Sequence, residues 1–91
     1  MKVVINRCYG GFSLSREAYD YLGLEWDGYG FAYEDDRINP KLIECLEVIG
    51  CEAASGALAS LKIVEIPDDV LWSLEEYDGV EWISELHRTW C

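Results

Sequence analysis

Residues 70–86 read VLWSLEEYDGVEWISEL, and the Asp78-Gly79 pair in this stretch decides the fold. An Asp-Gly pair between two runs of β-forming residues is the strongest short-range indication of a hairpin with a two-residue turn. We therefore expect antiparallel strands at residues 70–77 and 80–86.

A two-residue turn also sets the register of the hairpin. The expected cross-strand pairs are Tyr77 with Val80, Leu74 with Ile83, and Trp72 with Glu85. The same register places Trp72, Leu74 and Ile83 on one face and Tyr77, Val80 and Trp82 on the other. It also places Glu76 opposite Glu81, which is tolerable only where water reaches both carboxylates.

Two further strands are expected outside the hairpin. Residues 58–66 form a β-rich run that ends at Pro67, and Pro67 with the two acids after it marks a turn. Residues 2–8 (KVVINRC) begin with β-branched side chains and predict a first strand, broken by Gly10-Gly11.

Helix start and stop residues mark two helices between these strands. Ser15 is a good N-cap for a helix over residues 16–22, and Gly23 is a natural stop. Asn39-Pro40 opens a second helix, with apolar residues 42, 43, 46 and 49 at helical spacing before Gly50. Residues 51–56 predict a turn of small residues.

The elements follow the order β-α-α-β-β-β in a chain of 91 residues, which suffices for a single domain. We expect one acidic α+β domain over residues 1–91. Its simplest architecture is a mostly antiparallel four-stranded sheet with both helices on one face. The neighbour of the first strand in that sheet is left open.

Charge is the strongest compositional feature. Eighteen Asp and Glu against seven Lys and Arg give a formal net charge of −11. Such a surface repels nucleic acid and anionic membranes, and it attracts basic partners. Acidity also simply keeps proteins soluble, and both explanations stay open. The candidate protein-binding acids gather at two loop tips and on the hairpin: Glu34, Asp35, Asp36, Asp68, Asp69, Glu75, Glu76, Asp78, Glu81 and Glu85.

The four cysteines have no spacing typical of a zinc site, and no leader or membrane-spanning segment is evident. We therefore expect a cytosolic protein with reduced thiols, in which Cys8 and Cys45 act as small buried hydrophobic residues.

Catalytic patterns are weak. The single histidine, His87, is most simply a surface residue, and with eighteen acids some carboxylate pair always lies close together. Adjacent acids such as Asp35-Asp36 lack the alternating spacing of a calcium loop. We expect no enzyme, no metal and no cofactor.

A strand, a Gly-Gly turn and a capped helix start could in principle hold an anion. The phosphate-binding lysine and dinucleotide glycine patterns are both missing, so a tight chain reversal is the simpler explanation. The residues of this minority ligand site are Arg7, Gly10, Gly11, Ser13, Ser15 and Arg88.

Aromatic residues are abundant in the loop over residues 24–38 and near the C-terminal end. Exposed aromatic side chains beside acids make good protein-binding surfaces, and packing over the core is the competing explanation for each one. The candidates are Trp26, Tyr29, Phe31, Tyr33, Trp82 and Trp90.

The segments INRCYGGFSLS (residues 5–15), LKIVEIPDDV (61–70), EEYDG (75–79) and EWISELHRTW (81–90) together resemble a group of small phage-encoded proteins without a defined function. The likeness covers both ends of the chain and is weak over residues 23–37. It implies a viral protein that works in the cytosol of a bacterial host. Small acidic phage proteins often inhibit host defence, as anti-CRISPR proteins do, and this association is an analogy.

Three hypotheses follow. In the first, the protein inhibits a host defence protein by covering a basic nucleic-acid-binding surface. In the second, it binds or sequesters an anionic nucleotide. In the third, it is a self-assembling accessory phage protein. The expected partner is a host protein with a basic surface, without direct contact to nucleic acid or membrane, and the chain is a monomer or a homodimer.

Overall fold

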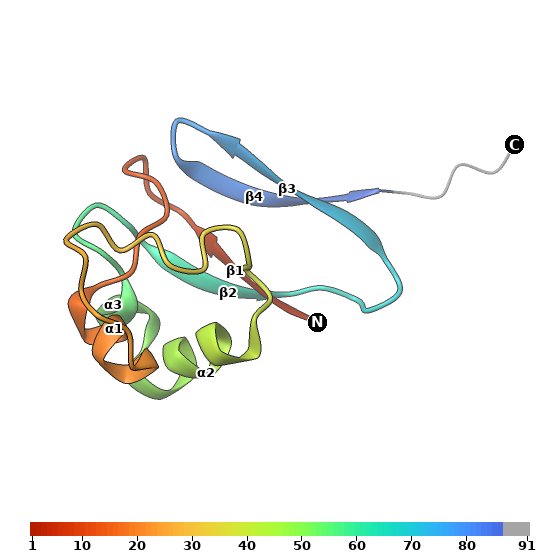
Figure 1. Ribbon diagram of the computed structural model, residues 1–91. Helices are drawn as coiled ribbons and strands as arrows, with labels where there is room; N and C mark the ends of the chain where they lie inside the picture. Colours follow the sequence, from red (N-terminus) through yellow and green to blue (C-terminus); the bar gives the residue numbers. More distant parts are fainter. Residues whose placement is uncertain (87–91) are drawn as a thin grey trace, which may run out of the picture.

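The protein is an α+β domain built in three layers, which the computed structural model describes over residues 1–86. Figure 1 shows helices on one face of a central pair of strands and a hairpin over the other face. The elements are β1 (Lys2–Asn6), α1 (Arg16–Leu22), α2 (Pro40–Ile49), α3 (Cys51–Ala54), β2 (Leu61–Glu65), β3 (Leu71–Tyr77) and β4 (Val80–Leu86).

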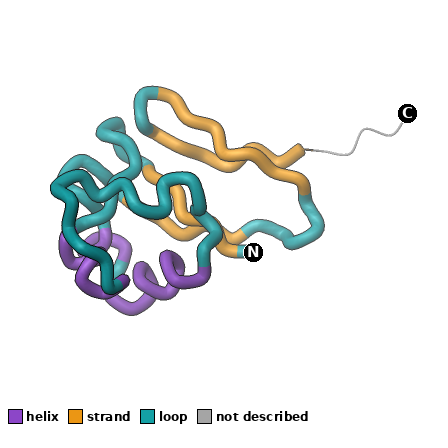
Figure 2. Tube along the Cα trace, in the orientation of Figure 1, coloured by secondary structure: helices purple, strands orange, loops and turns teal. Residues whose placement is uncertain are grey.

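The prediction of one four-stranded sheet is wrong. The strands form two separate antiparallel pairs, β1 with β2 and β3 with β4 (Figure 2). The reason lies at the second edge of β1. There the N–H of Val4 donates to the carbonyl of Arg37, and the N–H of Asn6 donates to the carboxylate of Glu81. A loop and a side chain thus occupy the place of a third strand.

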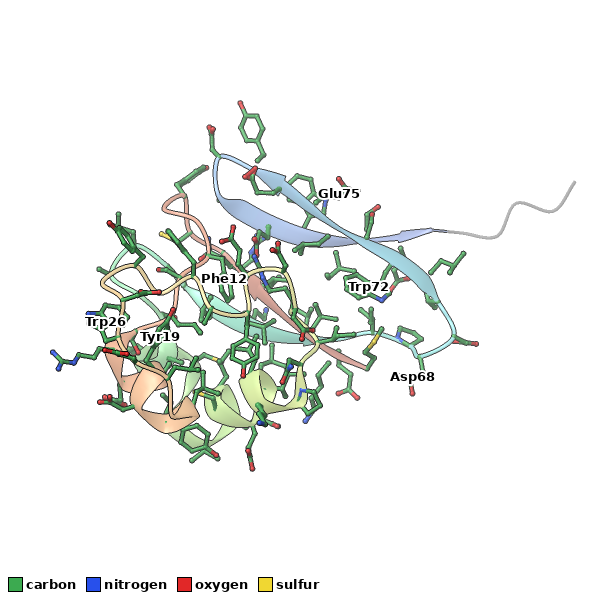
Figure 3. The ribbon with its side chains drawn as sticks, in the orientation of Figure 1. Phe12, Tyr19, Trp26, Asp68, Trp72 and Glu75 are labelled. Carbon is green, nitrogen blue, oxygen red and sulfur yellow. The ribbon has the colours of Figure 1, made fainter. Side chains whose placement is uncertain are left out.

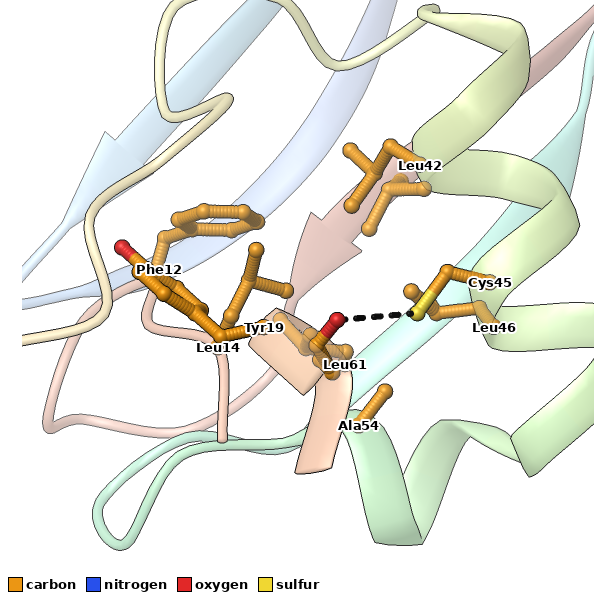
Figure 4. Close-up of a cluster of buried hydrophobic side chains, with 10 residues drawn as sticks. Phe12, Leu14, Tyr19, Leu42, Cys45, Leu46, Ala54 and Leu61 are labelled. Atoms are coloured by element: carbon orange, nitrogen blue, oxygen red, sulfur yellow. Dashed lines mark hydrogen bonds between the residues drawn. The ribbon is translucent and has the colours of Figure 1, made fainter. Parts of the chain in front are cut away.

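The central pair of strands separates two apolar clusters. Side chains of a strand alternate between faces, so Val4 points to the helices while Val3 and Ile5 point to the hairpin. The helix-side cluster is the larger, and Figure 4 shows its residues around Leu42 and Cys45. Burial raises the pKa of the Cys45 thiol, which agrees with its predicted role as a small buried hydrophobic residue. The same prediction for Cys8 is wrong, because Cys8 is only partly buried.

The hairpin-side cluster contains Val3, Ile5 and Ile66, packed against Val64 and three side chains from the hairpin: Trp72, Leu74 and Ile83. These three are the side chains that the sequence places together on one face. The opposite face of the hairpin is open, with Tyr77 and Trp82 both exposed. One face of the hairpin is therefore fixed to the domain and the other is in solvent.

Most local predictions are confirmed. The helix predicted over residues 16–22 is α1, with Ser15 accepting a hydrogen bond from the N–H of Ala18. Asn39 caps α2 by accepting from the N–H of Lys41. The bounds of three strands differ from the prediction: the first strand ends at Asn6, β2 covers only Leu61–Glu65, and β3 begins at Leu71. The small residues after Gly50, predicted as a turn, form the short helix α3.

The hairpin register is confirmed pair by pair, from Leu71 with Leu86 to Tyr77 with Val80. Asp78 and Gly79 have φ of 52° and 91°, as a two-residue turn of type I′ requires. The turn also contacts the segment after β1. A Cβ built on Gly79 would lie 2.4 Å from the carbonyl oxygen of Tyr9 and 2.6 Å from the nitrogen of Gly11.

We predict that Gly79→Ala destabilises the protein far more than Gly28→Ala does. Both glycines have a positive φ, 91° and 86°, but a Cβ on Gly28 would meet nothing within 4 Å. Gly28→Ala should therefore lower the free energy of unfolding by about 1 kcal/mol through backbone strain alone. Gly79→Ala adds a main-chain collision and should lower it by roughly 3 kcal/mol. Urea denaturation measures both, and equal effects would contradict this packing of the turn.

Candidate functional site

A buried ion pair links the loop before α2 to the hairpin. The side chains of Arg37 and Glu81 are both only 7% exposed. The guanidinium binds the carboxylate through both terminal nitrogens, with Nη2 at 2.7 Å from Oε2. Its Nε donates to the carbonyl of Glu34, and its Cζ atom lies 3.8 Å from the ring centre of Phe12. Hydrogen bonds and the Phe12 ring thus hold the pair in place.

This ion pair corrects the prediction for Glu81. The register does place Glu81 opposite Glu76, as expected, but only Glu76 is exposed to solvent. Glu81 points into the domain, where the guanidinium of Arg37 neutralises it. It is therefore a structural residue and does not contribute to an exposed acidic surface.

Asn6 is a second buried polar group, and it ties three segments together. Its side-chain amide donates to the carbonyls of Cys8 and Gly79, each at 2.7 Å. Its side-chain oxygen accepts from the N–H groups of Cys8 and Ser60. A fully buried amide with all four hydrogen bonds made fixes β1, the hairpin turn and the approach to β2 in one arrangement.

The candidate site is an acidic groove between the loop before α2 and strand β3. Its volume is about 370 Å³, and its lining is Glu34, Asp35, Asp36, Arg37, Ile38, Trp72 and Leu74. Because Arg37 is paired with Glu81, its charge does not offset the three exposed acids. We call these seven residues the acidic groove.

Consecutive tight turns hold the acids of this groove. The N–H of Glu34 donates to the carbonyl of Phe31, and the N–H of Asp36 donates to that of Tyr33, which has a φ of 64°. Asp36 also accepts a hydrogen bond from the side chain of Asn39, the cap of α2. The carboxylates therefore project from an ordered loop.

The other predicted acids lie around the hairpin. Glu75, Glu76 and Asp78 are exposed on β3 and its turn, where Glu75 accepts from the hydroxyl of Ser73. Asp68 lies at the turn before β3 (Figure 3). It pairs with the N-terminal ammonium, and its neighbour Asp69 is exposed. Glu85 lines a separate groove on the β4 side, together with the basic residues Arg7 and Lys62. Only Glu34, Asp35 and Asp36 are gathered at one groove.

In the segment predicted as an alternative anion site, hydrogen-bond donors are already bonded to other groups of the fold. The N–H groups of Leu14 and Ser15 donate to the carbonyls of Gly30 and Ala54, and the Ser15 hydroxyl donates to Ala53. Gly10 is packed so closely that a Cβ would lie 2.1 Å from the Leu58 carbonyl oxygen.

The structure does not bring all residues of that predicted ligand site together. Arg7 is directed to the carbonyl of Glu81, and the N–H of Gly11 donates to the carbonyl of Cys8. Gly10, Ser13 and Ser15 do line a second groove of about 430 Å³, beside the aromatic side chains of Trp26, Tyr29 and Phe31. Arg88, His87 and Trp90 lie outside the described residues.

The loop that carries these aromatic residues is ordered by Asp27. Its carboxylate accepts from the N–H groups of Tyr29 and Gly30, and these bonds hold its pKa below the ordinary value. The hydroxyl of Tyr19 donates to the same carboxylate and accepts from the N–H of Ala32. The rings of Tyr29 and Phe31 stack nearly parallel and stay largely exposed.

Two residues that organise the site are missing from the sequence-based predictions. Arg37 is the only basic residue between positions 24 and 40, which is a signal that the sequence does carry. Asn6 is a polar residue inside a run of β-branched neighbours, a position where a buried hydrogen-bonding role is common.

Within residues 1–86, no group of three or more His, Cys, Asp or Glu side chains is arranged to hold a metal ion. No helix in that part of the chain has the length and apolarity needed to cross a bilayer. No protein family, curated protein or solved structure matches the chain.

We predict that Asn6→Ala lowers the free energy of unfolding by roughly 3 kcal/mol, because it leaves buried main-chain groups without partners. Asn39→Ala is the control, since it removes the capping bond from Lys41 and one exposed hydrogen bond to Asp36, and it should cost about 1 kcal/mol. Thermal and urea denaturation of both variants test this. Similar losses would show that Asn6 is not a structural junction.

Proposed function

We propose that this chain is a protein-binding domain that docks its acidic groove and the adjoining β3 strand onto a basic surface of another protein. The observation that carries the proposal is the uncompensated charge of the groove. Three exposed acids line the groove together with Trp72, Leu74 and Ile38, and the arginine of the groove is neutralised by Glu81. Apolar side chains framed by charge provide both burial and electrostatic steering for a protein partner.

The acidic composition supports the same class of partner. A net charge of −11 accelerates encounters with basic surfaces and opposes binding to nucleic acid. Proteins that handle nucleic acid have the most extensive basic surfaces, so a nucleic-acid-binding protein is the partner we propose.

The resemblance to small phage proteins extends this proposal. If the chain works inside an infected bacterium, the partner is a host defence protein, and the acidic groove competes with nucleic acid for its basic surface. This role needs no chemistry from the inhibitor, and it agrees with our expectation that the chain is not an enzyme.

A nucleotide ligand is the second candidate, favoured by one observation. Gly10, Ser13 and Ser15 border a groove with the exposed rings of Tyr29 and Phe31, on which a base could stack. The donors of this segment are largely used within the fold. Binding to a basic protein surface is therefore the better-supported function.

We predict that Glu34→Gln combined with Asp35→Asn weakens binding to the basic partner at least about tenfold. The control combines Glu17→Gln and Asp20→Asn, which removes the same charge from the exposed face of α1 and should leave affinity nearly unchanged. Each protein is immobilised and exposed to bacterial lysate. Nucleic-acid-binding proteins should be retained at about 0.05 M salt and released at about 0.5 M salt.

Added DNA should displace the captured proteins, because it competes for the same basic surface. The proposed function is contradicted if neither salt nor DNA reduces the capture. It is also contradicted if the two double variants lose the same affinity.

A further inference from the structure

Strand β3 has an unpaired edge that borders the acidic groove. In a hairpin with a two-residue turn, Tyr77 and Val80 exchange main-chain hydrogen bonds, and so do the pairs that begin at Glu75 and Ser73. The residues between them direct their N–H and C=O groups away from the partner strand. On β3 the outward residues are Trp72, Leu74 and Glu76. On β4, Glu81 lies opposite Glu76 and should be directed outward in the same way. Its carbonyl accepts a hydrogen bond from the side chain of Arg7, which confirms this alternation.

No main-chain group within residues 1–86 pairs with this outer edge. The sheet that contains β3 has β4 as its single partner among the described strands. β1 differs in this respect, since Arg37 and Glu81 occupy its second edge. As far as the described residues go, the β3 edge thus keeps unused donors and acceptors at Trp72 and Leu74, and these two residues also line the groove.

The charges beside this edge select its occupant. Proteins commonly protect exposed edges with charged side chains that prevent pairing with another copy. Here Glu34, Asp35 and Asp36 lie across the groove, and Glu75 and Glu76 are on the strand itself. A second copy of a chain with charge −11 is repelled at this edge, whereas a cationic segment is attracted.

Resting on the proposed function, we propose that the β3 edge takes an extended segment of the partner as a third strand, with lysine or arginine at alternate positions. Alternate side chains of an added strand point to one face. Those that face the groove would place aliphatic stems against Trp72, Leu74 and Ile38, and their cationic ends near the three acids of the loop. Main-chain bonds to β3 provide affinity, and the alternate cations provide selectivity.

The test uses a terminally blocked octapeptide that alternates lysine with threonine. A second peptide of the same composition has four lysines followed by four threonines. Both carry the same charge, but only the first presents all its cations on one face of a strand. We expect the alternating peptide to bind at least about tenfold more tightly. Amide shifts in ¹⁵N spectra should concentrate at residues 71–77 and 34–38.

Main-chain methylation separates strand addition from simple charge attraction. An added strand directs only alternate N–H groups toward β3, so methylating either the four lysine or the four threonine nitrogens should abolish binding while the other set is tolerated. Lysine sensitivity indicates an antiparallel added strand and threonine sensitivity a parallel one. Either asymmetry supports the inference.

Two results would overturn the inference. If both peptides bind alike and both methylated sets are tolerated equally, the groove attracts charge without adding a strand, and the proposed function stands alone. If neither peptide binds, strand addition is wrong, and the salt-dependent capture from lysate decides the proposed function separately.

Discussion

The ion pair between Arg37 and Glu81 is the interaction on which the rest of the structure depends. Burying two charges is unfavourable unless each finds hydrogen-bonding partners, and here both do. The same two residues also satisfy the second edge of β1, through the main chain of Val4 and Asn6. One pair therefore closes the central sheet, anchors the hairpin as a separate layer and fixes the loop before α2.

This arrangement gives the surface its chemical character. The guanidinium of Arg37 is paired with Glu81 inside the domain. The acids that precede Arg37 in the loop therefore have no unpaired basic residue beside them in the groove. The hairpin is anchored by one face, so its other face and the outer edge of β3 stay accessible. A structural ion pair and an exposed acidic groove are thus two consequences of the same contact.

The sequence predicts the elements that depend on neighbouring residues. Ser15, Asn39 and the Asp78-Gly79 turn act within a few positions, so the helix starts and the hairpin register follow from local chemistry. The division into two sheets depends on Arg37 reaching a carboxylate 44 positions away. No local pattern reveals that contact, and for this reason Glu81 was predicted to be exposed. Glu34, Asp35 and Asp36 were identified because loop tips rich in acid are exposed in most folds.

The most direct test of this account is the coupling energy between Arg37 and Glu81 in a double-mutant cycle. Arg37→Met and Glu81→Leu each leave a buried charge without its partner, so each should lower the free energy of unfolding by about 3–5 kcal/mol. The double variant should lose much less than the sum, giving a coupling of at least about 2 kcal/mol. Additive losses would contradict the account, because they would mean that the two residues stabilise the protein independently.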